Sequence, residues 1–208
     1  MLEHVTAALI AGGKSKRFGS PKQKALYNGR SLLELAIQKI VRISSDAIIV
    51  GDVQHSQLKK PLPIHDDLER ECGPIGGIYT AMHFSKKRWV AIFPVDMPLL
   101  PISVYRFLYV SSRAGLPIVA KSDRGVEPLV SLWPIETLVL VKNQIEKKDF
   151  RLYYLLKLLN AIELDLSKIP GYNHLWFKNI NYKRDLQTLE SNMDHYGFSE
   201  LENEELKL

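Results

Sequence analysis

The stretch VTAALIAGGKSKRFGSPKQ, residues 5–23, decides the fold. Residues 5–10 form an apolar run with β-branched side chains, which is typical of a strand buried on both faces of a sheet. Gly12 and Gly13 end this run, and the segment after them is basic, with no acidic residue between Glu3 and Glu34. The sequence therefore predicts a buried strand that opens directly into a basic, glycine-containing loop.

Strand and helix patterns alternate outward from this first strand. Ser31 and Glu34 form a capping-box pattern at the start of an amphipathic helix over residues 31–43. This alternation predicts an α/β fold, a three-layer α/β/α sandwich with a mostly parallel, Rossmann-like sheet. The remaining predicted helices are 73–84 (a loop running into a helix), 101–113, 134–147, 150–160 and one from about 183; the remaining strands are 47–51, 88–96, 116–120, 126–133 and one near 176–180.

The composition is that of an ordinary globular protein, because 46% of the 208 residues are hydrophobic and 25% are charged. We expect a single domain over residues 1–195, followed by an acidic tail at 196–208. No apolar run reaches the roughly 20 residues that a membrane span needs, and the first residues lack the pattern of a signal peptide. We therefore expect a cytoplasmic protein without a membrane partner. A single cysteine, Cys72, cannot form an internal disulfide, and we assign it no chemistry.

The net charge of +5 is concentrated near the front of the chain. The basic loop fits neither G-x-x-x-x-G-K-[ST] nor G-x-G-x-x-G. Even so, glycine amides, lysines and Arg17 are the groups that would neutralise and cradle a triphosphate, while a turn with solvated charges is the alternative. Nucleic acid is not an expected partner, since the basic segment lacks interleaved aromatic residues and recognised docking motifs.

Ligands of such sheets bind beyond the carboxyl ends of the strands. Four segments fall at this edge in the predicted fold. They are residues 11–24 after the first strand, Gly51 and Asp52 after the second, 66–77 after a short third strand, and Asp96 after WVAIFPV.

The segment LIAGGKSKRFGSPKQKALYNGRSLLE, residues 9–34, resembles the signature of the nucleotidyltransferases of GT-A-like fold, the nucleotide-diphospho-sugar transferase type. Four later segments resemble motifs of one branch, the molybdenum cofactor guanylyltransferases. These are DDLERECGPIGGI (66–78), FPVDMPLLP (93–101), EPLVSLW (127–133) and FKNINYKRDL (177–186).

This resemblance implies an enzyme that transfers GMP from GTP to the phosphate of molybdenum-bound molybdopterin, forming molybdopterin guanine dinucleotide and pyrophosphate. It implies a nucleotide half at about 1–100 and an acceptor half at about 101–195. A molybdenum-insertion protein and apo-molybdoenzymes are the implied protein partners. No catalytic base is expected, because the acceptor phosphate is already ionised near neutral pH.

The resemblance also assigns roles to residues of the nucleotide half. Lys22 stands at the family's distance before Gly29 and is the expected phosphate-binding lysine, with Lys24 as a basic neighbour. Lys22, Arg17 and Asp96 are the expected catalytic residues, and Asp96 is the expected ligand of a Mg²⁺ cofactor. The expected nucleotide-binding residues are Ile10, Ala11, Gly12, Gly13, Lys22, Gly51, Asp66, Gly73, Gly77 and Asp96.

Two of the remaining assignments keep alternatives. Asp66 is expected to hold the nucleoside, but the adjacent Asp67 fits the motif as well. Asn179 and Asn181 are expected to bind the acceptor. Beyond them, Lys183 and Arg184 either help to hold the pterin phosphate or form a solvated first helical turn.

Two other functions remain open from the sequence. Gly51 stands where family members often carry an asparagine that contacts the base, and SPKQ (20–23) resembles a motif of cytidylyltransferases. A CTP-dependent cytidylyltransferase, acting on the pterin or on another small phosphorylated acceptor, is therefore the second enzyme hypothesis. A non-catalytic nucleotide-binding module is the third.

Overall fold

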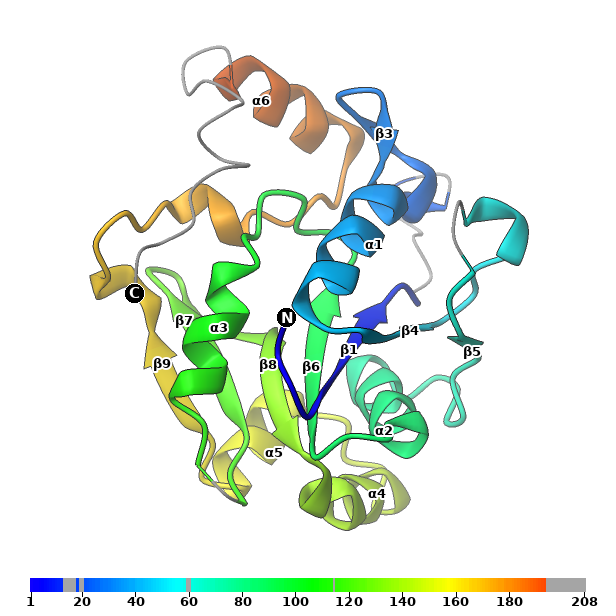
Figure 1. Cartoon of the computed structure of the whole chain (residues 1–208), viewed down its shortest axis with the longest axis vertical. Helices are drawn as coiled ribbons and strands as arrows, with labels where there is room; N and C mark the ends of the chain where they lie inside the picture. The colour runs from blue at the N-terminus through cyan, green and yellow to red at the C-terminus, as the bar shows by residue number, and fades with distance from the viewer. Residues whose placement is uncertain (13–17, 19–20, 59–60, 114, 194–208) are drawn as a thin grey trace.

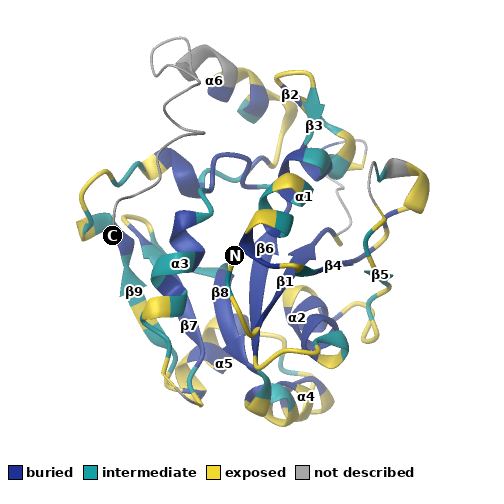
Figure 2. Cartoon of the chain, viewed as in Figure 1, coloured by how far each residue is buried: buried dark blue, intermediate teal, exposed yellow. Residues whose placement is uncertain are grey.

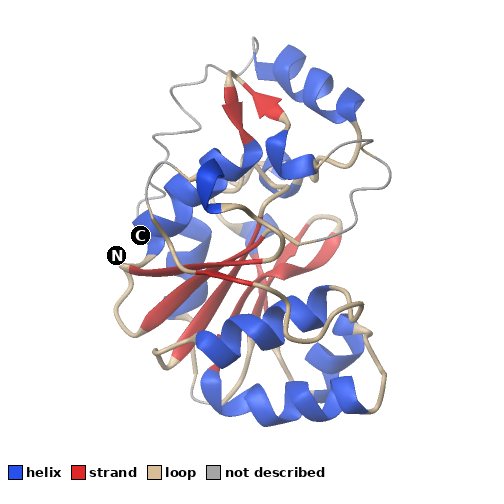
Figure 3. Ribbon diagram, turned by 90° about the vertical axis from the view of Figure 1, so that its right-hand side faces the viewer, coloured by secondary structure: helices blue, strands red, loops and turns tan. Residues whose placement is uncertain are grey.

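The computed structural model describes residues 1–12, 18, 21–58, 61–113 and 115–193, and its centre is a seven-stranded sheet. The strand order is β5-β4-β1-β6-β8-β7-β9, and two helical layers cover the sheet (Figures 1 and 3). The strands are β1 (Val5–Ile10), β4 (Asp46–Val50), β5 (Ile64–His65), β6 (Trp89–Pro94), β7 (Ile118–Ser122), β8 (Gly125–Pro134) and β9 (Ile162–Asp165). A separate short hairpin pairs β2 (Leu26–Tyr27) with β3 (Arg30–Ser31).

Helices lie on both faces of this sheet. One core cluster joins it to α1 (Leu32–Ile43), α3 (Ser103–Val110) and buried residues near the C-terminus, including some from α6 (Lys183–Met193). The other joins it to α2 (Pro74–Phe84), α4 (Leu138–Glu146) and α5 (Leu152–Leu158). The central strands are buried along their length (Figure 2). The predicted three-layer α/β/α sandwich is confirmed.

The sheet is mostly parallel, as predicted. β1 pairs in parallel with both β4 and β6, and β4 with β5 and β7 with β9 are parallel pairs too. β8 runs antiparallel to β6 and to β7. Its first residues therefore lie at the edge of the sheet where β6 ends, which is the edge where ligands bind in such folds.

The strand predicted near 176–180 is wrong. Residues His174–Phe177 form a turn of 3₁₀ helix, in which Trp176 and Phe177 are almost completely buried against the first core cluster. Their apolar run reflects packing onto the sheet rather than pairing within it. The strand at this edge is instead β9, whose sequence IELD alternates apolar and acidic residues, and charged side chains suit an edge strand.

The capping box predicted for the first helix is confirmed. Ser31 Oγ accepts a hydrogen bond from the Glu34 backbone N–H, and the Glu34 carboxylate accepts one from the Ser31 backbone N–H. This box holds the start of α1 directly behind the β2–β3 hairpin. It therefore ties the helix to the segment that carries Lys22.

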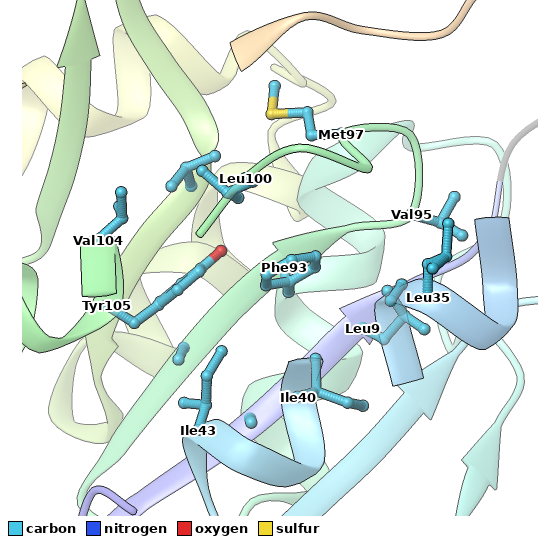
Figure 4. Packing of buried hydrophobic residues seen from close by; sticks show 14 of the residues in the cluster. Leu9, Leu35, Ile40, Ile43, Phe93, Val95, Met97, Leu100, Val104 and Tyr105 are labelled. Carbon is cyan, nitrogen blue, oxygen red and sulfur yellow. The ribbon is translucent and has the colours of Figure 1, made fainter. Parts of the chain in front are cut away.

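The end of β6 is set firmly by its core contacts. Phe93 stacks on Tyr105 of α3 with ring centroids 5.4 Å apart, and the buried Tyr105 hydroxyl donates to the Ile92 carbonyl (Figure 4). Val95 and Met97, on either side of Asp96, are both buried. Asp96 is therefore held between two anchored neighbours at the carboxyl edge of the sheet.

Among the described helices, none combines the length and the apolar character needed to cross a membrane. The predicted acidic tail lies outside the described residues, so the structure does not bear on it.

Candidate nucleotide and metal site

Lys22 and Asp96 form the centre of the candidate site. Lys22 begins a turn of 3₁₀ helix, and Asp96 follows β6. The Lys22 ammonium lies 2.8 Å from Asp96 Oδ2, and the two side chains are only 13% and 22% exposed. Two residues 74 positions apart in the sequence thus meet in a shielded ion pair, and both were expected to be catalytic.

Residues 179–181 lie against this ion pair. Lys22 Nζ donates to Asn181 Oδ1 at 3.0 Å. The Asn179 amide, with its nitrogen turned toward the carboxylate, donates to both oxygens of Asp96 at 3.2 Å. The backbone N–H of Ile180 donates to the Asp96 carbonyl at 2.9 Å. The two asparagines expected to bind the acceptor therefore contact the Lys22–Asp96 ion pair directly.

Asp185 holds this segment in place. Its Oδ2 accepts from the backbone N–H groups of Asn181 and Tyr182, at 2.7 and 2.8 Å. Burial acts to raise the pKa of Asp185, but these two hydrogen bonds and the charges of Lys178 and Arg184 outweigh it and lower the pKa. The carboxylate caps the start of α6 and fixes the backbone that carries Asn181. Sequence reasoning had assigned it no role.

The ends of β1 and β4 pack closely beside the ion pair. Val95 donates its backbone N–H to the Ile10 carbonyl, and Ala11 donates its own to the Val50 carbonyl. Gln23 Nε2 donates to the Asp52 carbonyl, which joins the Lys22 turn to the loop after β4. The structure thus brings the segments after β1, β4 and β6 together at one edge, as predicted.

Gly51 permits the closest of these approaches. Its φ is +123°, and a Cβ atom placed on it would lie 2.4 Å from the Gly12 nitrogen and 2.7 Å from Gly12 Cα. No side chain fits at position 51 without moving this backbone. The base contact that an asparagine would make is therefore unavailable from this position.

We expect Gly51→Ala to destabilise the protein by about 2 kcal/mol more than Gly125→Ala. Gly125 has nearly the same φ, +122°, but open space around it, so that its replacement costs only the backbone strain of about 1–2 kcal/mol. Urea unfolding of the two variants measures the difference. Equal losses would contradict the idea that contact with Gly12 constrains position 51.

Asp67, rather than Asp66, faces Gly12 and Gly77. A Cβ on Gly12 would lie 3.3 Å from Asp67 Oδ2, and one on Gly77 would lie 3.7 Å from Asp67 Oδ1. Asp66 is 76% exposed and faces Arg70 at 3.8 Å. The two adjacent side chains thus point in different directions, and only Asp67 points toward the expected nucleotide position.

The Asp67 carboxylate is poorly satisfied by the protein. Oδ1 is buried without a hydrogen-bond partner among the described residues. Partial burial, and next the charge of Asp66, raise the pKa of Asp67, and the Arg70 charge opposes them. A buried, unpartnered acceptor is costly unless a ligand supplies donors. This favours a ligand-binding role for Asp67.

The glycines at the start of α2 serve different purposes. Gly73 has a φ of +65° and open space around it, whereas a Cβ on Gly77 would come within 3.2 Å of the Ile10 side chain. Gly76 is tighter, because its Cβ would lie 2.5 Å from the Glu69 carbonyl. Gly77 therefore lets α2 begin beside Ile10, while Gly76 leaves room for the Glu69 carbonyl.

Gly13 and Arg17 lie outside the described residues, so their expected roles stay predictions. Cys72 is buried and unpaired, and burial and neighbouring carboxylates raise its pKa, which disfavours a reactive thiolate. Within the described residues, no three His, Cys, Asp or Glu side chains gather as a ready-made metal site. Any metal here would rely on Asp96, nearby amide oxygens and the ligand's own phosphates.

Glu127 is a further acid at this edge that sequence reasoning left without a role. It lies near the start of β8, is half-buried, and accepts a hydrogen bond from Ser122 Oγ at 2.8 Å. Burial is the largest influence on Glu127 and raises its pKa. The hydrogen bond from Ser122 and the charge of Arg124 lower this pKa, whereas the charges of Asp123 and Asp96 raise it, and the net shift is upward. Only its place in the EPLVSLW motif could have drawn attention to it.

The arrangement suits the handling of phosphates. Lys22, Asp96 and the side-chain amides of Asn179 and Asn181 converge beside the end of β6. Two small residues, 11 and 12, follow β1 at the same edge of the sheet. Such a set can bind a polyphosphate and a divalent cation. Within the described site, no serine or cysteine nucleophile pairs with a histidine.

Known proteins share the sequence pattern and the fold of this chain. The family model described as MobA-like NTP transferase domain matches residues 7–158. A probable molybdenum cofactor guanylyltransferase of Aquifex aeolicus is 29% identical over 191 residues, covering 92% of each chain. Another from Flavobacterium johnsoniae is 27% identical, covering 92% of this chain and all of that protein. The crystal structure of molybdopterin-guanine dinucleotide biosynthesis protein A from Archaeoglobus fulgidus superposes with a TM-score of 0.76 at 23% identity, covering 91% of this chain and 99% of that one, which shows a shared fold.

Proposed function

This chain belongs to the MobA-like NTP transferase domain family and is a nucleotidyltransferase, and we propose that it transfers GMP from GTP to the phosphate of molybdenum-bound molybdopterin. The observation that carries the proposal is the shielded Lys22–Asp96 ion pair, which Asn179 and Asn181 contact, at the same sheet edge as Gly12. The names of the relatives support the acceptor and the base. The products are molybdopterin guanine dinucleotide, which serves apo-molybdoenzymes, and pyrophosphate.

The oxygen donors around Asp96 fit Mg²⁺. This ion usually keeps several waters and binds through one or two carboxylates together with substrate phosphates. Asp96 would hold it, with the side-chain oxygen of Asn181 as a nearby oxygen donor and the Asn179 amide orienting the Asp96 carboxylate. When bound with the nucleotide, Mg²⁺ supplies positive charge that offsets the charge of the triphosphate.

Lys22 stabilises the charge that develops during transfer. An oxygen of the acceptor phosphate forms a bond to the α-phosphorus of GTP, and the bond from that phosphorus to the bridging oxygen of pyrophosphate breaks. The acceptor is already an anion, so no side chain has to remove a proton. Lys22 and the glycine amides hold two anions together and stabilise the leaving group.

Asp67 supports GTP as the nucleotide. A carboxylate only accepts hydrogen bonds, and guanine presents two adjacent donors, N1–H and the 2-amino group, whereas cytosine presents a single amino group beside an acceptor. The unpartnered Oδ1 of Asp67 is the acceptor that such an edge would satisfy. Because position 51 has no room for a side chain, we assign base recognition to Asp67.

We expect Mg²⁺-dependent binding of GTP to be about 100-fold tighter than that of CTP, and Asp67→Asn to remove most of this preference. Isothermal calorimetry with both nucleotides measures it. Asp66→Asn is the matched control, because the exposed Asp66 side chain points away from the site and its replacement should change neither affinity.

Other results would favour the competing functions. Tighter binding of CTP would indicate a cytidylyltransferase. Tight GTP binding without pyrophosphate release in the presence of molybdenum-bound molybdopterin would indicate a non-catalytic nucleotide-binding module.

A further inference from the structure

Glu127 lies at a break in the sheet beside the candidate site. The β7–β8 ladder pairs Val119 with Ser131 and then Ala120 with Glu127, so that residues 128–130 are left out of the pairing. Such bulges bend a strand and redirect its side chains, and they are over-represented next to active sites. Because β8 runs antiparallel to β6, this break lies at the edge of the sheet that also carries Asp96.

The Glu127 carboxylate is incompletely satisfied by the protein. Oε1 accepts from Ser122 Oγ, and neither a salt bridge nor a hydrogen bond to Oε2 is formed within the described part of the chain. The nearby guanidinium of Arg124 donates instead to the Phe177 carbonyl. A half-buried carboxylate that forms no salt bridge within the described residues, on the same edge as another acid, is a candidate for ligand binding.

The strand order separates Glu127 from the nucleoside end of the site. In the order β5-β4-β1-β6-β8, the residues that suit the nucleoside, Gly12 and Asp67, belong to the β5-β4-β1 side. Asp96 follows β6 in the middle, and Glu127 lies on β8, on the opposite side of Asp96 from Asp67. Glu127 therefore belongs to the acceptor half.

The charge of Glu127 determines which part of an acceptor it can contact. A carboxylate repels the acceptor's phosphate, and Lys22 already provides a cation where that phosphate must react. Glu127 accepts hydrogen bonds, so it suits a group that carries N–H donors. A 2-amino-4-oxo pterin ring has two such donors side by side, N3–H and the 2-amino group, which match the two oxygens of a carboxylate.

We propose that Glu127 is a specificity-determining residue that binds the N3–H and 2-amino edge of the pterin acceptor, with Ser122 orienting its carboxylate; this rests on the proposed function. The acceptor then lies with its ring toward β8 and its phosphate toward Lys22. The upward shift of the Glu127 pKa agrees with a carboxylate that its surroundings leave short of partners. Glu127 and Asp67 thus use the same chemistry for two rings on opposite sides of Asp96.

The test compares two fluorescent probes that differ at one position of the ring, pterin and lumazine, the latter carrying oxygen in place of the 2-amino group. Fluorescence titration of the wild-type protein should show pterin binding at least about 10-fold tighter than lumazine. Glu127→Gln keeps the size of the side chain but replaces one acceptor with a donor. It should reduce the preference to less than about 3-fold.

Two further variants separate recognition from folding. Glu163→Gln changes an exposed glutamate on β9 that is paired with Lys121, and it should keep the full preference. Ser122→Ala keeps the Glu127 carboxylate and removes only the hydroxyl that orients it, so the preference should fall by an intermediate factor. Unfolding midpoints of the variants show that each protein is folded during the titration.

The proposal is overturned if the wild-type protein does not distinguish the two probes, or if Glu127→Gln retains the distinction. Calorimetry of Mg²⁺ and GTP on the same proteins tests the proposed function separately. Glu127→Gln should leave GTP affinity unchanged, because Asp67 lies on the other side of the site. GTP binding without pterin selectivity would overturn this inference alone, and pterin selectivity without GTP binding would overturn only the proposed nucleotide.

Discussion

Lys22→Ala is expected to lower kcat/KM for nucleotidyl transfer by about 10³-fold. The substitution removes the only lysine ammonium that contacts Asp96 among the described residues. The charge that builds up on the pyrophosphate is then neutralised less well in the transition state. Most of the loss should fall on kcat, since the charge on the leaving group grows as the reaction proceeds.

Lys24→Ala is the matched control. Lys24 belongs to the same turn of 3₁₀ helix and has the same charge, but its side chain is exposed. Steady-state pyrophosphate release with GTP, Mg²⁺ and the pterin acceptor measures both variants, and Lys24→Ala should stay within about 3-fold of the wild-type protein. If the two variants lost activity equally, the phosphate-binding role would belong to the basic segment as a whole and not to Lys22.

Most of the fold could be predicted from periodicity, because buried parallel strands have continuous apolar runs and helices carry one apolar face. The direction of β8 could not be predicted, since a strand has the same residue pattern in either orientation. The error at 176–180 has a related cause. Trp176, Phe177 and Ile180 are apolar because they pack on the sheet, and periodicity does not distinguish that from pairing within it.

The candidate site could be predicted only as far as spacing determines it. The resemblance to the family motif, through the distance from Lys22 to Gly29, singled out the lysine that meets Asp96. Spacing could not decide between two adjacent residues, because Asp66 and Asp67 fit the motif equally. Only the three-dimensional structure shows that the Asp67 carboxylate faces Gly12. The contacts of Asn179 and Asn181 depend on pairing across more than 80 residues, which no local pattern records.

Asp96→Asn is expected to reduce kcat by about 10³-fold in saturating GTP, because an amide holds a divalent cation far less strongly than a carboxylate does. The change preserves the shape of the side chain but removes the charge that pairs with Lys22 at 2.8 Å. Mn²⁺ electron paramagnetic resonance reports metal binding independently of activity. In the presence of GTP, the variant should bind Mn²⁺ at least about 10-fold more weakly than the wild-type protein.

Asp52→Asn serves as the control for Asp96→Asn, since Asp52 is an exposed acid at the same edge of the sheet. Its Mn²⁺ affinity and kcat should match those of the wild-type protein. Unchanged Mn²⁺ binding in Asp96→Asn would contradict the assignment of Asp96 as the metal ligand.

The ion pair predicts a further outcome for the double variant. In the ligand-free protein, the Lys22 ammonium contacts the carboxylate that is to receive Mg²⁺, so the triphosphate and the metal must separate the two side chains together. The effects of Lys22→Ala and Asp96→Asn should therefore not add. The double variant should lose about as much activity as the more damaging single variant, whereas two independent sites would multiply the losses to about 10⁶-fold.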